Sequence, residues 1–202
     1  MDKETFSYQT VGQESFAEFS DRGSRFIGYA FPVASEDAFK ERLKQLRKEH
    51  PKAVHHCFAY RLGLDGNRFR SGDDGEPSGS AGRPILGQID SRGLTDTAIV
   101  VVRYFGGTLL GVPGLINAYK TASALALQVA PILEKPIEDK YHLEFDYTLV
   151  NEVMTILKRH QCSIFSQEMQ LFCHFTIGIP RRSLDNCITQ LSGIHGVVSK
   201  PA

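Results

Sequence analysis

The sequence has no excess of charge of either sign. Among its 202 residues, 23 are lysine or arginine and 23 are aspartate or glutamate, so the formal net charge is zero. This balance excludes a strongly basic nucleic-acid protein and an acidic solvating tail as descriptions of the whole chain, although a local basic face stays open. Hydrophobic residues make up 42% and charged residues 23%, which is typical of a folded globular protein and excludes disorder for most of the chain.

Long apolar runs and paired cysteine motifs are also missing. No stretch reaches the roughly 18 apolar residues that a membrane-spanning helix needs, so we expect no membrane partner. Residues 1–6 are mostly polar, which predicts no secretory leader. The four cysteines, at positions 57, 162, 173 and 187, show no Cys-x-x-Cys spacing. Free, mostly buried thiols in a reducing compartment are therefore expected, and we predict a cytoplasmic protein.

Two prolines divide the chain. Pro131 and Pro136 bracket four residues, and proline both removes a backbone donor and disfavours helix in the residue before it. A long helix must therefore end near Ala130, and a new pattern begins near Glu138. We place a domain boundary here and predict one domain over residues 1–133 and another over residues 134–202.

The first domain is predicted to alternate strands and helices. Residues 15–19 and 25–33 are rich in aromatic and β-branched side chains, as strands are. Ser35 is a predicted N-cap, because acidic residues follow it in the first helical turn. Residues 55–62 have the length and composition of another strand.

The last strand and helix of this domain have clearer signals. Residues 98–102 are continuously apolar, which indicates a central strand covered on both faces. A helix is predicted over residues 114–130. Its inner face is predicted to hold Leu115, Tyr119, Ala122, Ala126 and Val129.

The second domain has a β-α-β-β-α-β pattern. Strands are predicted at residues 140–147, 162–165, 169–179 and 196–198. A helix containing Val153, Ile156 and Leu157 follows the first strand, and Ser183 begins another. This order is that of the ferredoxin-like split βαβ motif, so the fold class is α+β.

Residues 70–84 form the first of two glycine-rich segments. Asp73, Asp74 and Glu76 could present carboxylates to a hydrated divalent cation, or the segment could be a solvated turn with side-chain caps. The spacing lacks the period of a calcium loop, so we assign no metal. A nucleophilic role for Ser80 would need an activating histidine that sequence cannot place, whereas Pro84 suits the first turn of a helix. The binding candidates here are Arg70, Asp73, Asp74, Glu76, Ser78, Ser80 and Arg83.

Residues 103–117 form the second segment, between the buried strand and the long helix. This arrangement can direct free backbone N–H groups and a positive helix end at an anion. Gly106 and Gly111 match the glycines of a phosphate-binding loop, but Val112 and Pro113 stand where lysine and serine or threonine belong, so nucleotide hydrolysis is not expected. The structural alternative is a simple turn, with its charges solvated or paired. The binding candidates are Arg103, Gly106, Gly107, Gly111, Gly114, Asn117 and Lys120.

Four motifs in this order resemble the IMPACT/YigZ family: residues 24–28 (SRFIG), 55–60 (HHCFAY), 73–82 (DDGEPSGSAG) and 101–111 (VVRYFGGTLLG). The two-domain layout resembles the bacterial YigZ branch. The resemblance implies a first domain with a left-handed βαβ fold, like the second domain of small-subunit ribosomal protein five. It implies a second domain similar to the last domain of elongation factor G. One departure is Val112-Pro113-Gly114, where the family often has Ala-Gly-Gly, because Pro113 stiffens the loop and removes an N–H.

The resemblance also implies a function. Eukaryotic members of the family regulate translation by binding an activator of the starvation-responsive initiation kinase. We therefore predict a non-enzymatic binding protein linked to translation, with RNA or a ribosome-associated protein as partner. Two alternatives stay open: an enzyme or binding protein that takes a small anion or a phosphate-bearing small molecule, and a protein-binding adaptor whose loops are only structural. No catalytic set is carried over, no cofactor is expected, and the oligomeric state is undetermined.

Overall fold

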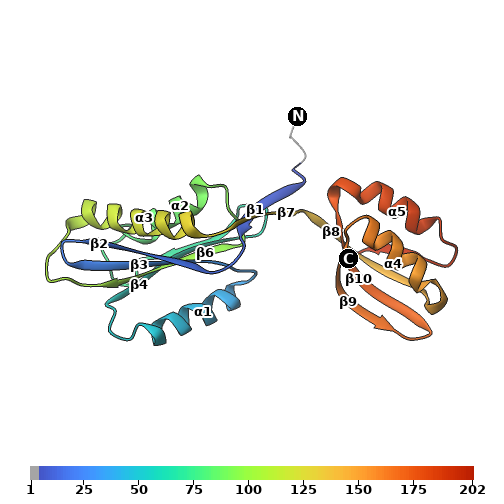
Figure 1. Ribbon diagram of the computed structural model, residues 1–202, viewed down its shortest axis with the longest axis horizontal. Coiled ribbons are helices and arrows are strands. Elements are labelled where there is room, and N and C mark those ends of the chain that lie inside the picture. The colour runs from blue at the N-terminus through green and yellow to red at the C-terminus, as the bar shows by residue number, and fades with distance from the viewer. Residues whose placement is uncertain (1–4) are drawn as a thin grey trace. The chain divides into compact units, whose positions relative to one another are not determined.

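The computed structural model describes residues 5–202, which form two compact units (Figure 1). The N-terminal unit comprises residues 8–135. The C-terminal unit comprises residues 136–202 together with residues 5–7 from the start of the chain. The mixed α+β class predicted from the sequence is confirmed. None of the helices in residues 5–202 has the length and apolar character needed to cross a membrane.

A five-stranded antiparallel sheet forms the centre of the N-terminal unit, with the strand order β2-β3-β6-β4-β5. The middle strand, β6, is buried along its length except at its last residue, Tyr104. This confirms the central strand predicted from its apolar run. The strands are β2 (Ser15–Asp21), β3 (Ser24–Pro32), β4 (His55–Leu62), β5 (Arg68–Gly72) and β6 (Thr97–Tyr104).

Helices cover both faces of this sheet (Figure 1). Helix α1 (Glu36–Glu49) packs on one face, where its Phe39 and Leu46 join a core with Val100 and Val102 of β6. Its predicted cap is confirmed, because the Ser35 side chain accepts a hydrogen bond from the Ala38 N–H at 3.2 Å. The other face is covered by α2 (Gly82–Ser91) and α3 (Gly111–Val129).

The inner face of α3 is as predicted except at its end. Leu115, Tyr119, Ala122 and Ala126 are buried, but Val129 is 58% exposed. Val129 is the last residue of the helix, and the chain becomes extended at the next residue, Ala130. The prediction for Val129 was therefore wrong: the helix ends at this residue, and the first extended residue, Ala130, is buried instead.

The C-terminal unit confirms the β-α-β-β-α-β order. Its antiparallel sheet has the strand order β11-β8-β10-β9, and α4 and α5 pack on one face. Strand β10 lies beside β8 although a helix and a strand separate them in sequence, which is the split βαβ arrangement. The elements are β8 (Glu138–Asp146), α4 (Val150–Arg159), β9 (Ser163–Met169), β10 (Phe172–Pro180), α5 (Leu184–Ser192) and β11 (Val198–Pro201).

A small two-stranded sheet was not predicted. Strand β1 (Ser7–Val11) pairs with β7 (Ile132–Pro136), the segment between the two prolines. Hydrogen bonds extend the pairing at both ends, from the Gly12 N–H to the Pro131 carbonyl and from the Ile137 N–H to the Phe6 carbonyl, each 2.8 Å. The prolines therefore end the long helix, as expected, but the residues between them form a strand.

Candidate functional site around Glu76 and Arg103

Glu76 joins the two glycine-rich segments. Its Oε1 accepts a hydrogen bond from Nη1 of Arg103 at 2.5 Å and another from the Tyr119 hydroxyl at 2.7 Å. Arg103 lies at the end of β6, just before the second segment, and Tyr119 lies two turns inside α3. The first segment is therefore bonded to the strand and the helix that flank the second.

The Arg103 guanidinium is buried, and its charge is paired within the fold. Arg103 is 5% exposed, and its guanidinium lies over the rings of Phe26 and Phe105, at 5.4 and 5.6 Å from their centroids. Its Nε is buried and has no hydrogen-bond partner among residues 5–202. Because Glu76 already neutralises Arg103, an anionic ligand would have to compete with a buried carboxylate at hydrogen-bond distance.

Asp73 organises the start of α2. Its Oδ1 accepts hydrogen bonds from the Ala81 and Gly82 N–H groups at 3.0 and 2.8 Å, and its Oδ2 accepts one from the Gly79 N–H at 2.8 Å. Burial by itself would raise the pKa of Asp73, but these three amides, with Arg83 nearby, hold that pKa below its usual value. The Asp73 side chain thus caps the N-terminus of α2, although Asp73 lies eight residues before the N-cap position, Ala81.

Asp74 connects the same segment to α1 and β4. Its Oδ1 accepts a hydrogen bond from Nη2 of Arg47 at 2.8 Å, and its Oδ2 accepts one from the His56 N–H at 2.7 Å. Its own carbonyl lies 2.8 Å from Nδ1 of His55. Asp74 has a φ of 42°, a left-handed conformation that aspartate tolerates better than most residues. The carboxylate therefore fixes a strained turn against two neighbouring elements.

The remaining candidates of the first segment divide into buried and exposed residues. Ser80 is fully buried, and its hydroxyl donates a hydrogen bond to the Pro77 carbonyl at 2.6 Å. This contact gives Ser80 a structural use and hides it from any substrate. Arg70, Ser78 and Arg83 are exposed. Within the described part of the chain, no three His, Cys, Asp or Glu side chains come together in a way that would hold a metal ion.

Gly106 of the second segment lies against another part of the backbone. A Cβ at Gly106 would lie 1.9 Å from the carbonyl carbon of Gly23, so only glycine fits. Its N–H donates a hydrogen bond to Oγ of Ser24 at 3.2 Å. This contact joins the loop after β6 to the turn between β2 and β3.

The other candidates of the second segment lie nearer the surface. Gly107 and Gly111 adopt positive φ values of 88° and 70°. Gly114 is half-buried, whereas Asn117 and Lys120 are exposed along α3. The structure therefore brings Arg103 together with Glu76 but leaves Asn117 and Lys120 on the surface of the helix.

An exposed apolar segment follows β6 and continues into the first turns of α3. We call residues 105–116 the apolar segment. Four of its large apolar side chains are open to solvent, with exposed fractions of 81% for Leu109, 48% for Phe105, 47% for Val112 and 39% for Ile116, whereas its Leu110 and Leu115 are buried. Val112 and Ile116 are four residues apart on the helix and so share a face. Several large exposed apolar side chains within one short segment mark contact surfaces more often than catalytic pockets.

The nucleophilic side chains of this region are held in their neutral forms. Burial raises the pKa of the Cys57 thiol well above its usual value, and burial likewise raises that of the Tyr119 hydroxyl. The Cys57 thiol donates to the Asp73 carbonyl at 2.9 Å. Neither group is ionised near neutral pH, so neither is an activated nucleophile.

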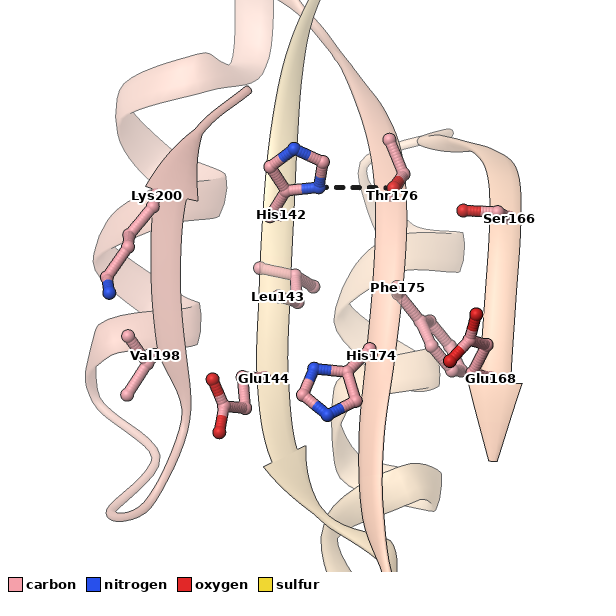
Figure 2. Close-up of a pocket in the computed structure, with 10 residues that line it drawn as sticks. All are labelled: His142, Leu143, Glu144, Ser166, Glu168, His174, Phe175, Thr176, Val198 and Lys200. Atoms are coloured by element: carbon pink, nitrogen blue, oxygen red, sulfur yellow. Dashed lines mark hydrogen bonds between the residues drawn. The ribbon is translucent and has the colours of Figure 1, made fainter. Parts of the chain in front are cut away.

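A second candidate site lies on the sheet of the C-terminal unit, opposite α4 and α5 (Figure 2). A hollow of about 230 Å³ opens there. His142 on β8 lies opposite Thr176 on β10, with 3.1 Å between Nδ1 and Oγ1, and His174 on β10 lies between Glu144 and Glu168 in the strand register.

Sequence reasoning missed this second site. The alternation of polar and apolar residues along 140–147 indicates a polar face, but it does not show that the face stays open. Tyr119 was placed in the core, as the structure shows, but its bond to Glu76 was not foreseen. A buried tyrosine needs a partner for its hydroxyl, and that was the signal available in the sequence.

Residues 22–127, more than half of the chain, match the family described as the Impact N-terminal domain. This chain belongs to the IMPACT family. The family predicted from the four motifs is therefore confirmed, and the matched range contains Glu76, Arg103, Tyr119 and the apolar segment. The sheet face with His142 and His174 lies outside this range.

Curated relatives of this IMPACT family protein come from bacteria and from animals. It is 37% identical over 155 residues to the IMPACT family member YvyE of Bacillus subtilis, covering 77% of this chain and 71% of the relative. It is 34% identical over 159 residues to the IMPACT family member YigZ of Escherichia coli, covering 78% of each. Protein IMPACT of Rattus norvegicus is 33% identical over 100 residues, which cover 47% of this chain and 31% of that protein.

Solved structures match as well. The crystal structure of a hypothetical protein is 28% identical and superposes with a TM-score of 0.79 over 98% of both chains. The two-domain translational regulator Yih1 is 26% identical, covering 63% of this chain and 49% of that chain, with a TM-score of 0.36. The first of these matches spans both units of this IMPACT family protein.

Proposed function

We propose that this protein regulates translation as a non-enzymatic binding protein whose partner is a ribosome-associated protein. Membership of the IMPACT family supports the link to translation. The observation that supports binding over catalysis is the way the family motifs are used. Asp73 caps a helix, Asp74 ties the loop to α1 and β4, and Glu76 pairs with Arg103. These groups hold the loops in place and are not presented to a substrate.

The apolar segment is the surface that we assign to the partner. Leu109, at 81% exposed, is the most open large apolar side chain of the protein's described residues. The loop that precedes α3 is held in place by the contact of Gly106 with Gly23 and by the bond between Arg103 and Glu76. The exposed apolar side chains are therefore attached to a fixed part of the backbone. A rigid apolar patch loses little conformational entropy on binding, which favours a protein partner.

Binding to ribosomes isolated at low salt, with their associated proteins, tests this proposal. The full chain is expected to co-sediment with them, and the double variant Leu109→Asp, Val112→Asp is expected to bind at least about tenfold more weakly, because it places two charges in an apolar contact. Val129→Asp is the matched control, since Val129 is also exposed on α3 but at its opposite end. An equal loss of ribosome binding in the double variant and in Val129→Asp, or no loss of binding in either, would contradict the assignment.

The same experiment separates a protein partner from RNA. Ribosomes stripped of associated proteins by high-salt washing should no longer bind the chain. If protein-free ribosomal RNA binds it instead, with affinity falling steeply as salt rises, then phosphates supply the binding energy and the proposed protein partner is wrong. Exposed arginines such as Arg68 and Arg70 on β5 would be the residues to vary in that case.

An anion-binding site is the second candidate function. Its support is the start of α3, where the N-cap residue, Leu110, offers no side-chain acceptor and no acidic residue occupies the first turn. Against it stand the pairing of Arg103 and the missing N–H of Pro113. Thermal unfolding with nucleotides, phosphosugars and divalent ions tests it, since a ligand at a hundredfold excess over Kd stabilises the native state by about 2.7 kcal/mol. An unchanged midpoint with every compound excludes this candidate.

A further inference from the structure

Two of the four cysteines lie side by side in the C-terminal unit. The Sγ atoms of Cys162, just before β9, and of Cys187, in α5, are 3.7 Å apart. The sulfur atoms of Cys57 and Cys173 contact the backbone carbonyls of Asp73 and Gln170 instead. Among residues 5–202, which include all four thiols, Cys162 and Cys187 make the one thiol–thiol contact.

The fold holds these two thiols in place. Gln161 adopts a left-handed φ of 55° in the tight turn after α4, and the Cys162 N–H donates to the Leu157 carbonyl at 2.9 Å. Cys187 is fully buried in the core between α5 and the sheet, whereas Cys162 is only partly buried. A disulfide needs its sulfur atoms about 2.05 Å apart, so the two must approach by roughly 1.7 Å, which is a side-chain movement.

We propose that Cys162 and Cys187 form an oxidation site at which hydrogen peroxide closes an intramolecular disulfide. The Cys162 sulfur attacks one peroxide oxygen, the O–O bond breaks, and a first water leaves while Cys162 becomes a sulfenic acid. The Cys187 thiolate then attacks the Cys162 sulfur, the S–O bond breaks, and the second water leaves. Two thiols lose two hydrogens, and the peroxide is reduced to two waters.

The two thiols have different roles because their surroundings differ. Cys162 is the more accessible, so it meets the oxidant first. Either thiol can be the donor in the hydrogen bond between them. With Cys162 as the donor, this bond raises the pKa of Cys162 and lowers the pKa of Cys187, so a thiolate is favoured at Cys187, where the second step needs the attacking group. Accessibility, and not thiolate character, therefore selects Cys162 for the first step.

Peroxide treatment of the full chain tests this inference. The protein is treated with hydrogen peroxide, unfolded in an alkylating reagent, and digested without reduction by trypsin and by a protease that cuts after glutamate. Cleavage after Glu168 is essential, because trypsin alone leaves Cys162 and Cys173 in one peptide. We expect two of the four thiols to escape alkylation, a cross-linked peptide pair containing Cys162 and Cys187, and full recovery of four thiols with dithiothreitol.

Single variants complete the test. Cys162→Ser replaces a partly exposed thiol, so it is expected to fold and to form no internal disulfide. Cys173→Ala is the matched control in the same unit and should still close the bond between Cys162 and Cys187. A bond that involves Cys57 or Cys173, a bond between two chains, or irreversible oxidation with no bond at all would overturn the proposal.

Discussion

At the scale of single residues, Glu76 and Arg103 determine how the first glycine-rich segment is held. Both side chains are almost fully buried, with 4% of Glu76 and 6% of Arg103 exposed. Removing a charge from water is costly, and the pair offsets that cost only while both partners are present. The Tyr119 hydroxyl, which shares the same carboxylate oxygen, adds a second donor.

Glu76→Ala is therefore expected to be strongly destabilising. It leaves the Arg103 charge buried without its partner, and breaking such a pair costs about 3–5 kcal/mol of unfolding free energy. Urea unfolding measures this difference. Ser78→Ala, an exposed neighbour in the same loop, should change the free energy by no more than about 0.5 kcal/mol. A loss for Glu76→Ala no larger than that of Ser78→Ala would show that the pair does not hold the fold.

Asp73 gives a prediction about pH. Its pKa is lower in the folded protein than in the unfolded chain, so its contribution is present above the unfolded value of about 3.9 and is lost as the pH falls through the folded value. Asp73→Asn, which removes an acceptor for the amides at α2, should cost about 1–2 kcal/mol at neutral pH. That difference from the native protein should shrink below about pH 4.

Urea unfolding of both proteins between about pH 7 and pH 3 measures this dependence. Asp37→Asn is the matched control, because the Asp37 side chain lies near the start of another helix but is 90% exposed. A difference for Asp73→Asn that stays constant across the range would contradict a lowered pKa at this carboxylate.

The sequence indicated which of these residues matter, but not how. The glycine density and the acidic cluster singled out Asp73, Asp74 and Glu76 as candidates for binding an ion. In the fold, they bind amides, arginines and a tyrosine of the protein itself. That outcome depends on β4 lying beside β6, which brings His55 into register with Arg103. Pairing between residues as distant in sequence as His55 and Arg103 cannot be derived from local pattern.

At the scale of elements, the contact between β3 and α3 depends on one small residue. A Cβ at Gly28 would lie 2.5 Å from the Ala122 carbonyl oxygen and 3.2 Å from the Ala126 Cβ. The motif that contains Gly28 therefore has a packing role: it lets the long helix lie close to the sheet. The small side chains of Ala122 and Ala126, both buried on the inner face of α3, serve the same purpose.

Gly28→Ala is expected to destabilise the N-terminal unit by about 1–3 kcal/mol, because the added methyl group has to displace helix backbone. Gly87→Ala is the matched control. Gly87 lies within α2, and its added Cβ would meet nothing within 4 Å. It should therefore stabilise the protein by about 0.5–1 kcal/mol through helix propensity. Thermal or urea unfolding measures both, and a neutral Gly28→Ala would show that α3 can move away from β3 at little cost.

Elements with strong local patterns were predictable, and elements made by distant pairing were not. The apolar run of β6, the Ser35 cap and the β-α-β-β-α-β order all follow from nearby residues. Strand β7 does not, because its residues lie between prolines and are exposed along their whole length. Only its pairing with β1, more than 100 residues earlier in the chain, makes it a strand.

At the scale of the whole molecule, the two units have separate cores. Phe26, Ile99 and Tyr119 belong to the N-terminal unit, whereas Phe145 and Phe175 belong to the C-terminal unit. The candidate sites are divided in the same way: the apolar segment belongs to the first unit, and the sheet-face hollow and the cysteine pair belong to the second. Binding and oxidation can therefore be altered separately by mutation.

The bond between Phe6 and Ile137 has a consequence for how the protein is made. The C-terminal unit contains residues 5–7 as well as residues 136–202, so residues 5–7 leave the ribosome about 130 residues before the partners they need. At roughly 5–20 residues per second, that interval lasts several seconds to tens of seconds. The N-terminal unit is synthesised as far as the end of α3 at Val129 within that interval, while residues 5–7 wait for their partners. Vectorial synthesis thus sets an order of assembly in which the smaller unit closes last.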